Sequence, residues 1–151
     1  MNVFVFGTRG FPGIQGGVEK HCESLYSKLV SKSNSITVFR RRPYVVQDKK
    51  LKNRDIKFID LPSTRIKGFE AFFHSFLCTC ISIYQHPDIV HIHNIGPAMF
   101  SPLLKWRGIK IVLTYHSPNY EHAKWGYVAR LILKISEHLA LNYADAILFV
   151  N

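Results

Sequence analysis

The pattern of apolar and polar positions along the chain predicts six strands that mostly alternate with helices. Short apolar runs end at turn residues, and longer segments between them repeat apolar side chains every three or four positions. The strands are expected at residues 3–6, 36–39, 56–59, 88–93, 109–114 and 146–150. Several of them are apolar on both faces, which is typical of a parallel sheet covered on both sides. The sequence therefore predicts an α/β protein with a Rossmann-like, doubly wound parallel sheet.

The second predicted helix, residues 69–84, is rich in aromatic side chains. One stripe of this helix holds Phe69, Phe72, Phe73, Phe76, Cys80 and Tyr84. Apolar stripes at helical spacing usually face a core, so we expect this face to be buried. An alternative is partial insertion into the surface of a bilayer, since Arg65 and Lys67 precede the helix. The segment is too short and too polar to span a membrane.

A glycine-rich loop joins the first strand to the first helix, which is expected over residues 18–29. The loop reads G-T-R-G-F-P-G-I-Q-G-G-V-E from Gly7 to Glu19. Glycine lets a backbone approach an anion closely, and the first turn of a helix carries roughly half a positive charge. The loop therefore predicts a phosphate site, and the alternative is a loop shaped by glycine and Pro12 for packing alone. Its spacing is not that of the G-x-G-x-x-G dinucleotide fingerprint.

Right-handed crossovers favour the strand order 3-2-1-4-5-6 for this succession of elements. In that order the topological switch lies between the first and fourth strands, where doubly wound sheets bind ligands outside the carboxyl ends of the strands. Three segments are then expected to meet: the glycine loop, the turn at His93 and Asn94, and the loop from Tyr115 to Trp125. These three segments form the predicted site.

Composition narrows the class of protein. The chain has 151 residues, of which 47% are hydrophobic and 20% charged, so one globular domain is expected over residues 1–151. Its three cysteines form no C-x-x-C pair and leave an odd number. That count favours reduced thiols in a cytoplasmic protein over a disulfide framework. The N-terminal residues show no export signal.

The positive charge is concentrated in one part of the sequence. The formal net charge is +10, and residues 28–67 hold twelve Lys or Arg against three Asp. Such a patch attracts nucleic acid, anionic lipid or a phosphorylated substrate, and the alternative is a solvated surface without a partner. We expect it to bind an anionic membrane surface next to the aromatic helix. The side chains expected to face the membrane are Arg40, Arg41, Arg42, Phe72 and Phe73.

Histidines lie near the ends of two predicted strands. His91 and His93 belong to D-I-V-H-I-H and His116 follows the next strand, so a three-histidine metal site is one interpretation. On a parallel strand, H-x-H is more often one packed and one site histidine, and no further ligand lies nearby in sequence, so we expect no metal. The chain also lacks a G-x-S-x-G elbow and a G-x-x-x-x-G-K-[ST] loop, which argues against hydrolases and kinases.

Three motifs together resemble the N-terminal domain of family-four glycosyltransferases with the GT-B fold. They are G-T-R-G-F-P-G-I-Q-G-G-V-E-K-H from Gly7, D-I-V-H-I-H-N from Asp88 and T-Y-H-S-P-N-Y-E-H-A-K-W-G from Thr114. The resemblance covers the whole chain and is strongest for a subgroup that makes bacterial surface polysaccharide, including rhamnosyl- and N-acetylhexosaminyltransferases. It implies a second, C-terminal domain beyond Asn151 that carries most of the sugar-nucleotide site. The chain would then be an acceptor-binding domain that is inactive by itself.

The resemblance also implies roles for particular residues. Gly16 and Gly17 would face the donor diphosphate, and His116 would lie beside the transferring sugar as the catalytic residue. The residues expected to border the acceptor are Arg9, His93, Asn94, Glu121 and Lys124. The loop departs from the subgroup at residues 117–120, where a more glycine- and acid-rich run is expected, and this leaves the identity of the acceptor open.

The implied reaction moves a sugar, with retention of configuration, from a UDP-, GDP- or dTDP-linked donor. The implied acceptor is an undecaprenyl-diphosphate-linked glycan at the cytoplasmic membrane face, in O-antigen (lipopolysaccharide) or capsule biosynthesis. Fixed N–H groups and cations can stabilise the leaving diphosphate, so no metal or other cofactor is expected. Two other functions stay open: an NADP-dependent sugar-modifying oxidoreductase that uses residues 40–42 for the 2′-phosphate, and a basic nucleic-acid-binding module. The second is weakened because no RNP, helix-turn-helix or zinc pattern accompanies the charge, so nucleic acid is not an expected partner.

Overall fold

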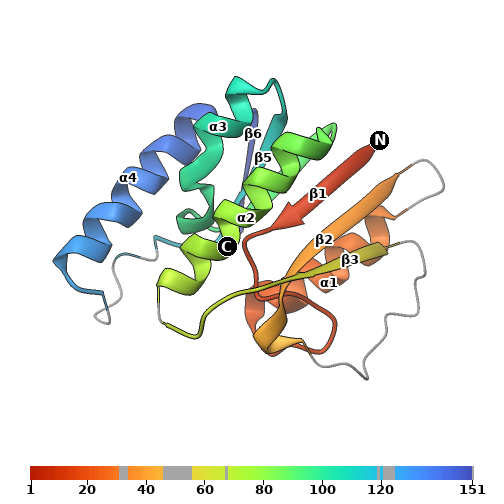
Figure 1. Ribbon diagram of the computed structural model, residues 1–151, viewed down its shortest axis with the longest axis horizontal. Helices are drawn as coiled ribbons and strands as arrows, with labels where there is room; N and C mark the ends of the chain where they lie inside the picture. Colours follow the sequence, from red (N-terminus) through yellow and green to blue (C-terminus); the bar gives the residue numbers. More distant parts are fainter. Residues whose placement is uncertain (31–33, 46–55, 67, 119, 121–124, 151) are drawn as a thin grey trace.

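A six-stranded parallel sheet with helices on both faces forms the protein (Figure 1). The computed structural model describes residues 1–30, 34–45, 56–66, 68–118, 120 and 125–150. The strand order is β3-β2-β1-β4-β5-β6, and every neighbouring pair is parallel. The predicted fold class and strand order are therefore confirmed. The strands are β1 (Asn2–Phe6), β2 (Ser35–Arg41), β3 (Ile56–Leu61), β4 (Ile89–His93), β5 (Lys110–Tyr115) and β6 (Ala146–Phe149).

Helix α1 covers one face of the sheet, and the other helices cover the opposite face (Figure 1). Two 3₁₀ turns, η1 and η2, follow β2 and β4. The two helices predicted over residues 18–29 and 69–84 agree with α1 and α2 to within one residue. The bounds are α1 (Gly17–Leu29), η1 (Arg42–Tyr44), α2 (Phe69–Gln85), η2 (Gly96–Phe100), α3 (Ser101–Trp106) and α4 (Tyr127–Tyr143).

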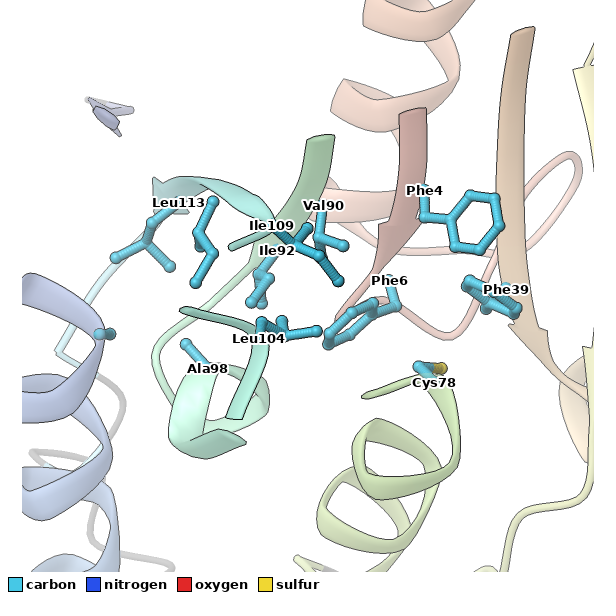
Figure 2. Close-up of a cluster of buried hydrophobic side chains, with 12 residues drawn as sticks. Phe4, Phe6, Phe39, Cys78, Val90, Ile92, Ala98, Leu104, Ile109 and Leu113 are labelled. Carbon is cyan, nitrogen blue, oxygen red and sulfur yellow. The ribbon is translucent and has the colours of Figure 1, made fainter. Parts of the chain in front are cut away.

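Successive residues of β1 enter two different cores, because side chains of a strand alternate between the faces of a sheet. Phe4 and Phe6 point into the larger core, where they meet Phe39, Cys78 of α2 and Leu104 of α3 (Figure 2). Val5 enters the smaller core beneath α1. Both faces of β1 are thus fully used for packing, and only its carboxyl end is left for a site.

The aromatic stripe of α2 does not face the core, so this prediction was wrong. Phe69, Phe72 and Phe76 are 50%, 39% and 43% exposed. The helix instead packs on the sheet through small and polar side chains. These buried residues are His74, Ser75, Cys78, Thr79 and Ser82. Ser75 and Ser82 donate their hydroxyl hydrogens to carbonyls one turn back, at 2.7 and 2.8 Å, so their burial leaves no hydroxyl unpaired.

Helix α4 packs in the same way. Its buried residues are Ser136 and Ala140, whereas the apolar stripe that includes Leu131 and Ile135 is exposed. The Ser136 hydroxyl donates to the carbonyl oxygen of Ile132 at 2.8 Å. In the part of the chain that the structure describes, no helix has the length and apolar character needed to cross a bilayer.

Candidate functional site

The loops at the carboxyl ends of β1, β4 and β5 meet at the topological switch. The backbone N–H of Asn94 donates a 3.0 Å hydrogen bond to the carbonyl oxygen of Thr114. The side-chain amide of Asn94 donates to the carbonyl oxygen of Gly7 over 3.4 Å. His93 ends β4, and its Nδ1 lies 3.3 Å from Nε2 of His116. The predicted meeting of the glycine loop, the His93–Asn94 turn and the start of the loop after β5 is confirmed.

Gly7 lets the glycine loop lie directly against β4. Its φ is 105°, and a Cβ built there would lie 2.1 Å from the carbonyl oxygen of His93. A side chain at this position would therefore move the backbone of one strand or the other. The loop then closes on α1, because the carboxylate of Glu19 accepts a 3.2 Å hydrogen bond from the backbone N–H of Arg9.

The first turn of α1 is open beside Gly17. A Cβ at Gly17 would have no neighbouring atom of the described residues within 4 Å, whereas a Cβ at Gly16 would collide with the carboxylate of Glu19. Open space at a helix N-terminus suits an anion. The Glu19 carboxylate already occupies part of the same positive end of the helix. The diphosphate-binding roles of Gly16 and Gly17 stay predictions.

Buried histidines lie next to this loop, on the α1 side of the sheet. The hydroxyl oxygen of Tyr26 is 2.7 Å from Nδ1 of His91 and 2.7 Å from Nε2 of His93. Burial lowers the pKa of His91 to about 4 and that of His93 well below its usual value. Burial, and then the neighbouring His21, lower the pKa of His116. All three rings are therefore neutral near pH 7.

A three-histidine metal site gains no support from this geometry. Both ring nitrogens of His91 are engaged, one by Tyr26 and the other by Thr114. Within the described ranges, no group of three or more His, Cys, Asp or Glu side chains is arranged to hold a metal ion. The histidines form a hydrogen-bonded cluster instead.

Sequence reasoning missed His21 as a member of this cluster. Its ring centroid lies 5.5 Å from that of His116 and 6.3 Å from that of His93. His21 comes four residues after Gly17, so it returns to nearly the same face of α1 as the open start of the helix. That spacing in G-G-V-E-K-H was the available signal.

A cavity of about 1000 Å³ lies beside the glycine loop. Residues of the loop, the first turn of α1 and the turn after β4 form one side of it, and Arg9 and Asn94 are among them. The beginnings of α2 and α4 form the other side. The apolar wall of the cavity consists of Phe69, Phe72, Trp125, Val128, Ile132 and Leu133 on this side, together with Pro97 and Met99 of η2. One cavity thus joins the predicted donor loop to the exposed ends of two helices.

The polar floor of the cavity is an ion pair that the sequence did not predict. Arg41 is only 5% exposed, and its guanidinium lies 3.6 Å from the carboxylate of Glu70. Tyr44 donates its hydroxyl to the other carboxylate oxygen at 2.5 Å. Two buried polar atoms of lining residues, Nε of Arg41 and Oγ1 of Thr8, have no hydrogen-bond partner among the described residues. The floor is therefore polar, and its own hydrogen bonds do not satisfy all of its buried polar atoms.

The three consecutive arginines do not form the expected membrane-facing patch. Arg40 binds both carboxylate oxygens of Asp60, at 2.6 and 2.9 Å, and Arg41 is buried in the cavity floor. For Arg41 the prediction of a membrane-facing side chain was wrong, because β2 continues two residues further than expected and turns this side chain inward. Arg42 is exposed and donates to the carbonyl oxygen of Asp60. The same pairing removes Arg40 and Arg41 as free ligands for a 2′-phosphate.

The other predicted site residues divide into two groups. Arg9 lines the cavity, and its guanidinium carbon lies 5.2 Å from the centroid of the Tyr44 ring. Phe72 lies in the cavity wall, and Phe73 is half-buried with its ring centroid 6.1 Å from that of Phe69. Glu121 and Lys124, which were expected to border the acceptor, lie outside the described residues.

Comparison with known proteins identifies one family. The sequence profile described as Glycosyltransferase Family 4 matches residues 15–151. No curated protein sequence matches the chain. A sucrose-phosphate synthase from Thermosynechococcus elongatus has a similar fold, with a TM-score of 0.70, 15% identity and 97% of this chain covered. The enzyme WbmH of Bordetella bronchiseptica, solved in complex with NAD+, gives a TM-score of 0.56, 10% identity and 98% coverage. The chain spans only 41% and 55% of the lengths of these two proteins.

Proposed function

The chain belongs to glycosyltransferase family 4, and we propose that it forms the acceptor-side domain of a retaining enzyme that transfers a hexosyl unit to a lipid-linked glycan. The donor would be a UDP-, GDP- or dTDP-linked sugar, and the acceptor an undecaprenyl-diphosphate-linked glycan of O-antigen or capsule biosynthesis. The larger share of the donor site would belong to a second, C-terminal domain. The observation that carries the proposal is the cavity beside the glycine loop, which has a polar floor and an apolar wall.

The donor diphosphate would lie at the open start of α1. Cleavage of a sugar–phosphate bond develops negative charge on the leaving diphosphate, and preorganised N–H groups stabilise such charge. The space beside Gly17 supports this position, since no described side chain fills it. In this proposal the N–H groups of α1 and nearby cations supply the stabilisation that a metal ion supplies elsewhere.

An amphipathic acceptor fits the two halves of the cavity. Sugar hydroxyls both donate and accept hydrogen bonds, so they match a floor where the guanidinium of Arg41 is a donor and the carboxylate of Glu70 is an acceptor. The apolar wall would take the first isoprene units of the lipid, because burial of apolar surface contributes about 25 cal/mol per Å². Among the residues that line the cavity, the positive charges of Arg9 and Arg41 are balanced by the negative charges of Glu19 and Glu70. This balance favours a neutral glycan over a free phosphate.

His116 is the residue that we propose as catalytic. Its lowered pKa keeps the ring neutral near pH 7, so one nitrogen can donate and the other can accept a hydrogen bond. A neutral imidazole beside the transferring sugar can receive the proton of the attacking hydroxyl group. Neither Glu19 nor Glu70 is assigned as a nucleophile. The carboxylate of Glu19 accepts a hydrogen bond from the backbone N–H of Arg9, and that of Glu70 pairs with Arg41 and accepts from Tyr44.

The wall can be tested with a matched pair of substitutions on α4. Val128 and Leu131 are both exposed aliphatic side chains, at 68% and 49%, but only Val128 lines the cavity. In the full-length protein we expect Val128→Ser to raise the KM for the lipid-linked acceptor roughly three- to tenfold, which corresponds to about 1 kcal/mol of lost apolar contact. Leu131→Ser should leave this KM unchanged. Equal effects of the two substitutions would contradict an acceptor site in this cavity.

Peripheral membrane association, which we also propose, rests mainly on the aromatic face of α2. Phe76 is 43% exposed, and its ring packs against Phe100 with centroids 5.6 Å apart. Binding to anionic vesicles should weaken between 0.1 and 1 M salt, where the Debye length falls from roughly 10 to 3 Å, and should leave a salt-resistant remainder. In a co-sedimentation assay, Phe76→Ser should lose the salt-resistant binding. The control Trp106→Ser should keep it, because Trp106 is an exposed aromatic residue just before β5, at the amino edge of the sheet. Equal binding of all three proteins would argue against this face.

The reaction itself is tested with the full-length protein and a panel of nucleotide sugars. Each donor is offered with an undecaprenyl-diphosphate-linked glycan and with the same glycan released from its lipid. We expect transfer from one donor, with a clear preference for the lipid-linked acceptor. No transfer from any donor, or firm binding of NADPH, would overturn the transferase assignment, whereas equal use of both acceptors would overturn only the lipid part.

A further inference from the structure

A buried chain of hydrogen bonds runs from Thr114 to His116. Nε2 of His91 lies 2.7 Å from Oγ1 of Thr114, and Nδ1 of the same ring lies 2.7 Å from the hydroxyl oxygen of Tyr26. That hydroxyl oxygen is also 2.7 Å from Nε2 of His93, whose Nδ1 is 3.3 Å from Nε2 of His116. Thr114, Tyr26 and His93 are fully buried and His91 nearly so. Water therefore does not compete for the inner bonds of this chain.

The fold holds each member of the chain in position. His91 and His93 are two residues apart on β4, so they share one face, and their rings stack with centroids 4.5 Å apart. Thr114 is the register partner of His93 on β5. The ring of Tyr26 stacks on Phe11 with centroids 5.9 Å apart and an interplanar angle of 1°. These packing contacts fix the hydroxyl of Tyr26 between the two imidazoles.

The hydroxyl of Tyr26 has one proton but two imidazole nitrogens at hydrogen-bond distance. It can donate to one ring only, and when it does so it accepts an N–H from the other. Because the hydroxyl is fully buried, leaving its proton without an acceptor would cost free energy, so donation to one of the two rings is favoured. Suppose that it donates to Nδ1 of His91. Then His91 carries its proton on Nε2 and donates to Thr114, and His93 donates from its own Nε2 to Tyr26. Nδ1 of His93 is then an acceptor, so His116 donates from Nε2 and its Nδ1 carries a lone pair.

The reverse direction moves the proton of every ring to the other nitrogen. Thr114 donates to Nε2 of His91, and Nδ1–H of His91 donates to Tyr26. Tyr26 then donates to Nε2 of His93, and Nδ1–H of His93 donates to Nε2 of His116. His116 in this arrangement carries its own proton on Nδ1. A mixture of tautomers among neutral rings would either break one of the four bonds or, if Tyr26 accepted from both rings, leave its buried hydroxyl proton without an acceptor in this chain.

We propose that Tyr26 is a positioning residue that forces His91, His93 and His116 into one common tautomer. The direction of the chain decides whether Nδ1 of His116 accepts or donates a hydrogen bond, because the tautomer of an imidazole is set by the bond at its other nitrogen. The role of this tautomer in catalysis rests on the transferase proposed above. There, Nδ1 of His116 as an acceptor can receive a hydrogen bond from the attacking hydroxyl group. Nδ1–H of His116 as a donor can instead bond to the leaving phosphate oxygen.

The protonation of the cluster agrees with this arrangement. The pKa values of His91, His93 and His116 are lowered, and burial raises the pKa of the Tyr26 hydroxyl well above its usual value. The chain is therefore uncharged near pH 7. Among the described residues, the other titratable groups that face it come from α1: His21 lies against His93 and His116, and Cys22 lies near Tyr26.

The tautomers can be read directly from long-range ¹H–¹⁵N correlation spectra of the full-length protein labelled at histidine. At pH 7 we expect the signals of His91, His93 and His116 to show the same tautomer. Signals that place one of these protons on Nδ1 and another on Nε2 overturn the proposal. This measurement on the unaltered protein decides the matter even if a variant fails to fold.

The variant Tyr26→Phe removes the hydroxyl that joins the two halves of the chain. We expect the tautomer of His93 or His116 to change or to become mixed, and the pKa of His116 to shift. Tyr84→Phe, which removes an exposed tyrosine hydroxyl on α2, should leave the spectra unchanged. If Tyr26→Phe folds and leaves the three histidines as they were, the proposal fails.

Activity assays separate this inference from the proposed function. If the full-length protein transfers sugar, Tyr26→Phe should lower kcat about tenfold and shift its pH profile, with the acceptor KM changed less than twofold. An unaltered kcat and pH profile would overturn the positioning role. If the protein transfers no sugar at all, the proposed function fails, while the spectra still decide whether the common tautomer exists.

Discussion

The substitution Gly17→Val tests whether the first turn of α1 holds the donor diphosphate. A valine Cβ would enter space that no described neighbour fills within 4 Å, so the Cβ itself meets no packing obstacle. Valine has a slightly higher helix propensity than glycine, by a few tenths of a kcal/mol. We therefore expect a change in stability below about 1 kcal/mol, or roughly 2–4 °C in Tm for a domain of this size.

The effect on catalysis should be much larger than the effect on stability. Hydrogen bonds to a charged group contribute about 1.5–3 kcal/mol each, and the branched side chain would keep the diphosphate from the N–H groups of the turn. Loss of one such bond in the transition state lowers kcat/KM roughly 10- to 150-fold. Gly17→Ala, which adds a single methyl group, should lie between the unaltered protein and Gly17→Val.

The assay is sugar transfer by the full-length protein at several donor concentrations, with a thermal melt of the same samples. A fall in kcat/KM with an unchanged melt supports a diphosphate at Gly17. A melt that collapses would show that the glycine is required for packing. Unchanged transfer and an unchanged melt would remove the donor from this end of α1.

Two further predictions concern stability. Gly7→Ala should lower the free energy of unfolding by about 2–5 kcal/mol in a urea titration. Of this loss, the positive φ accounts for about 1–2 kcal/mol and the close approach of the new Cβ to β4 for about 1–3 kcal/mol. Gly108→Ala, which has a positive φ but no neighbour within 4 Å, should lose only the first of these two amounts. Stability should also fall between pH 7 and pH 5, because His74 and His91 have folded pKa values of about 4 and the unfolded chain binds more protons in that window. The loss is about 2 kcal/mol for each histidine, and an unchanged unfolding free energy at pH 5 would contradict neutral, buried rings.

Strand order and the place of the site could be predicted because they follow from local patterns and from the handedness of crossovers. Apolar runs define the strands, and a glycine loop between β1 and α1 marks the carboxyl edge of the sheet. Once the order was known, the turn at His93 and Asn94 had to lie beside Gly7. No information about side-chain contacts was needed for this step.

Contacts between elements could not be predicted in the same way. The pair of Arg41 and Glu70 joins β2 to α2, and the bond from Tyr26 to His91 joins α1 to β4. In sequence, the first pair is separated by the connection of residues 42–69. Nothing in either local pattern distinguishes Arg41 from its neighbour Arg40, because only the extra length of β2 turns Arg41 inward.

The face by which α2 packs on the sheet was misjudged for a physical reason. Hydrophobicity assigns the phenylalanines of α2 to the core, but Ser75 and Ser82 bury their hydroxyls at little cost by donating to carbonyls of their own helix. Their small side chains also let the helix axis approach the sheet. A helix can therefore bury its small polar face, and the pattern of apolar residues does not show it.

The same misjudgement indicates where the site lies. Contiguous apolar surface on a folded domain often marks an interaction or ligand site, and sequence rules tend to fail at functional positions. Phe69 and Phe72 of α2 and Val128 and Ile132 of α4 are exposed, yet all four line the cavity that begins at the glycine loop. Because the small residues hold both helices against the sheet, these large side chains are free to form a wall around a ligand. The wall thus originates from the choice of small residues for the packing faces of the helices, whereas the polar floor around Arg41 originates from the extra length of β2.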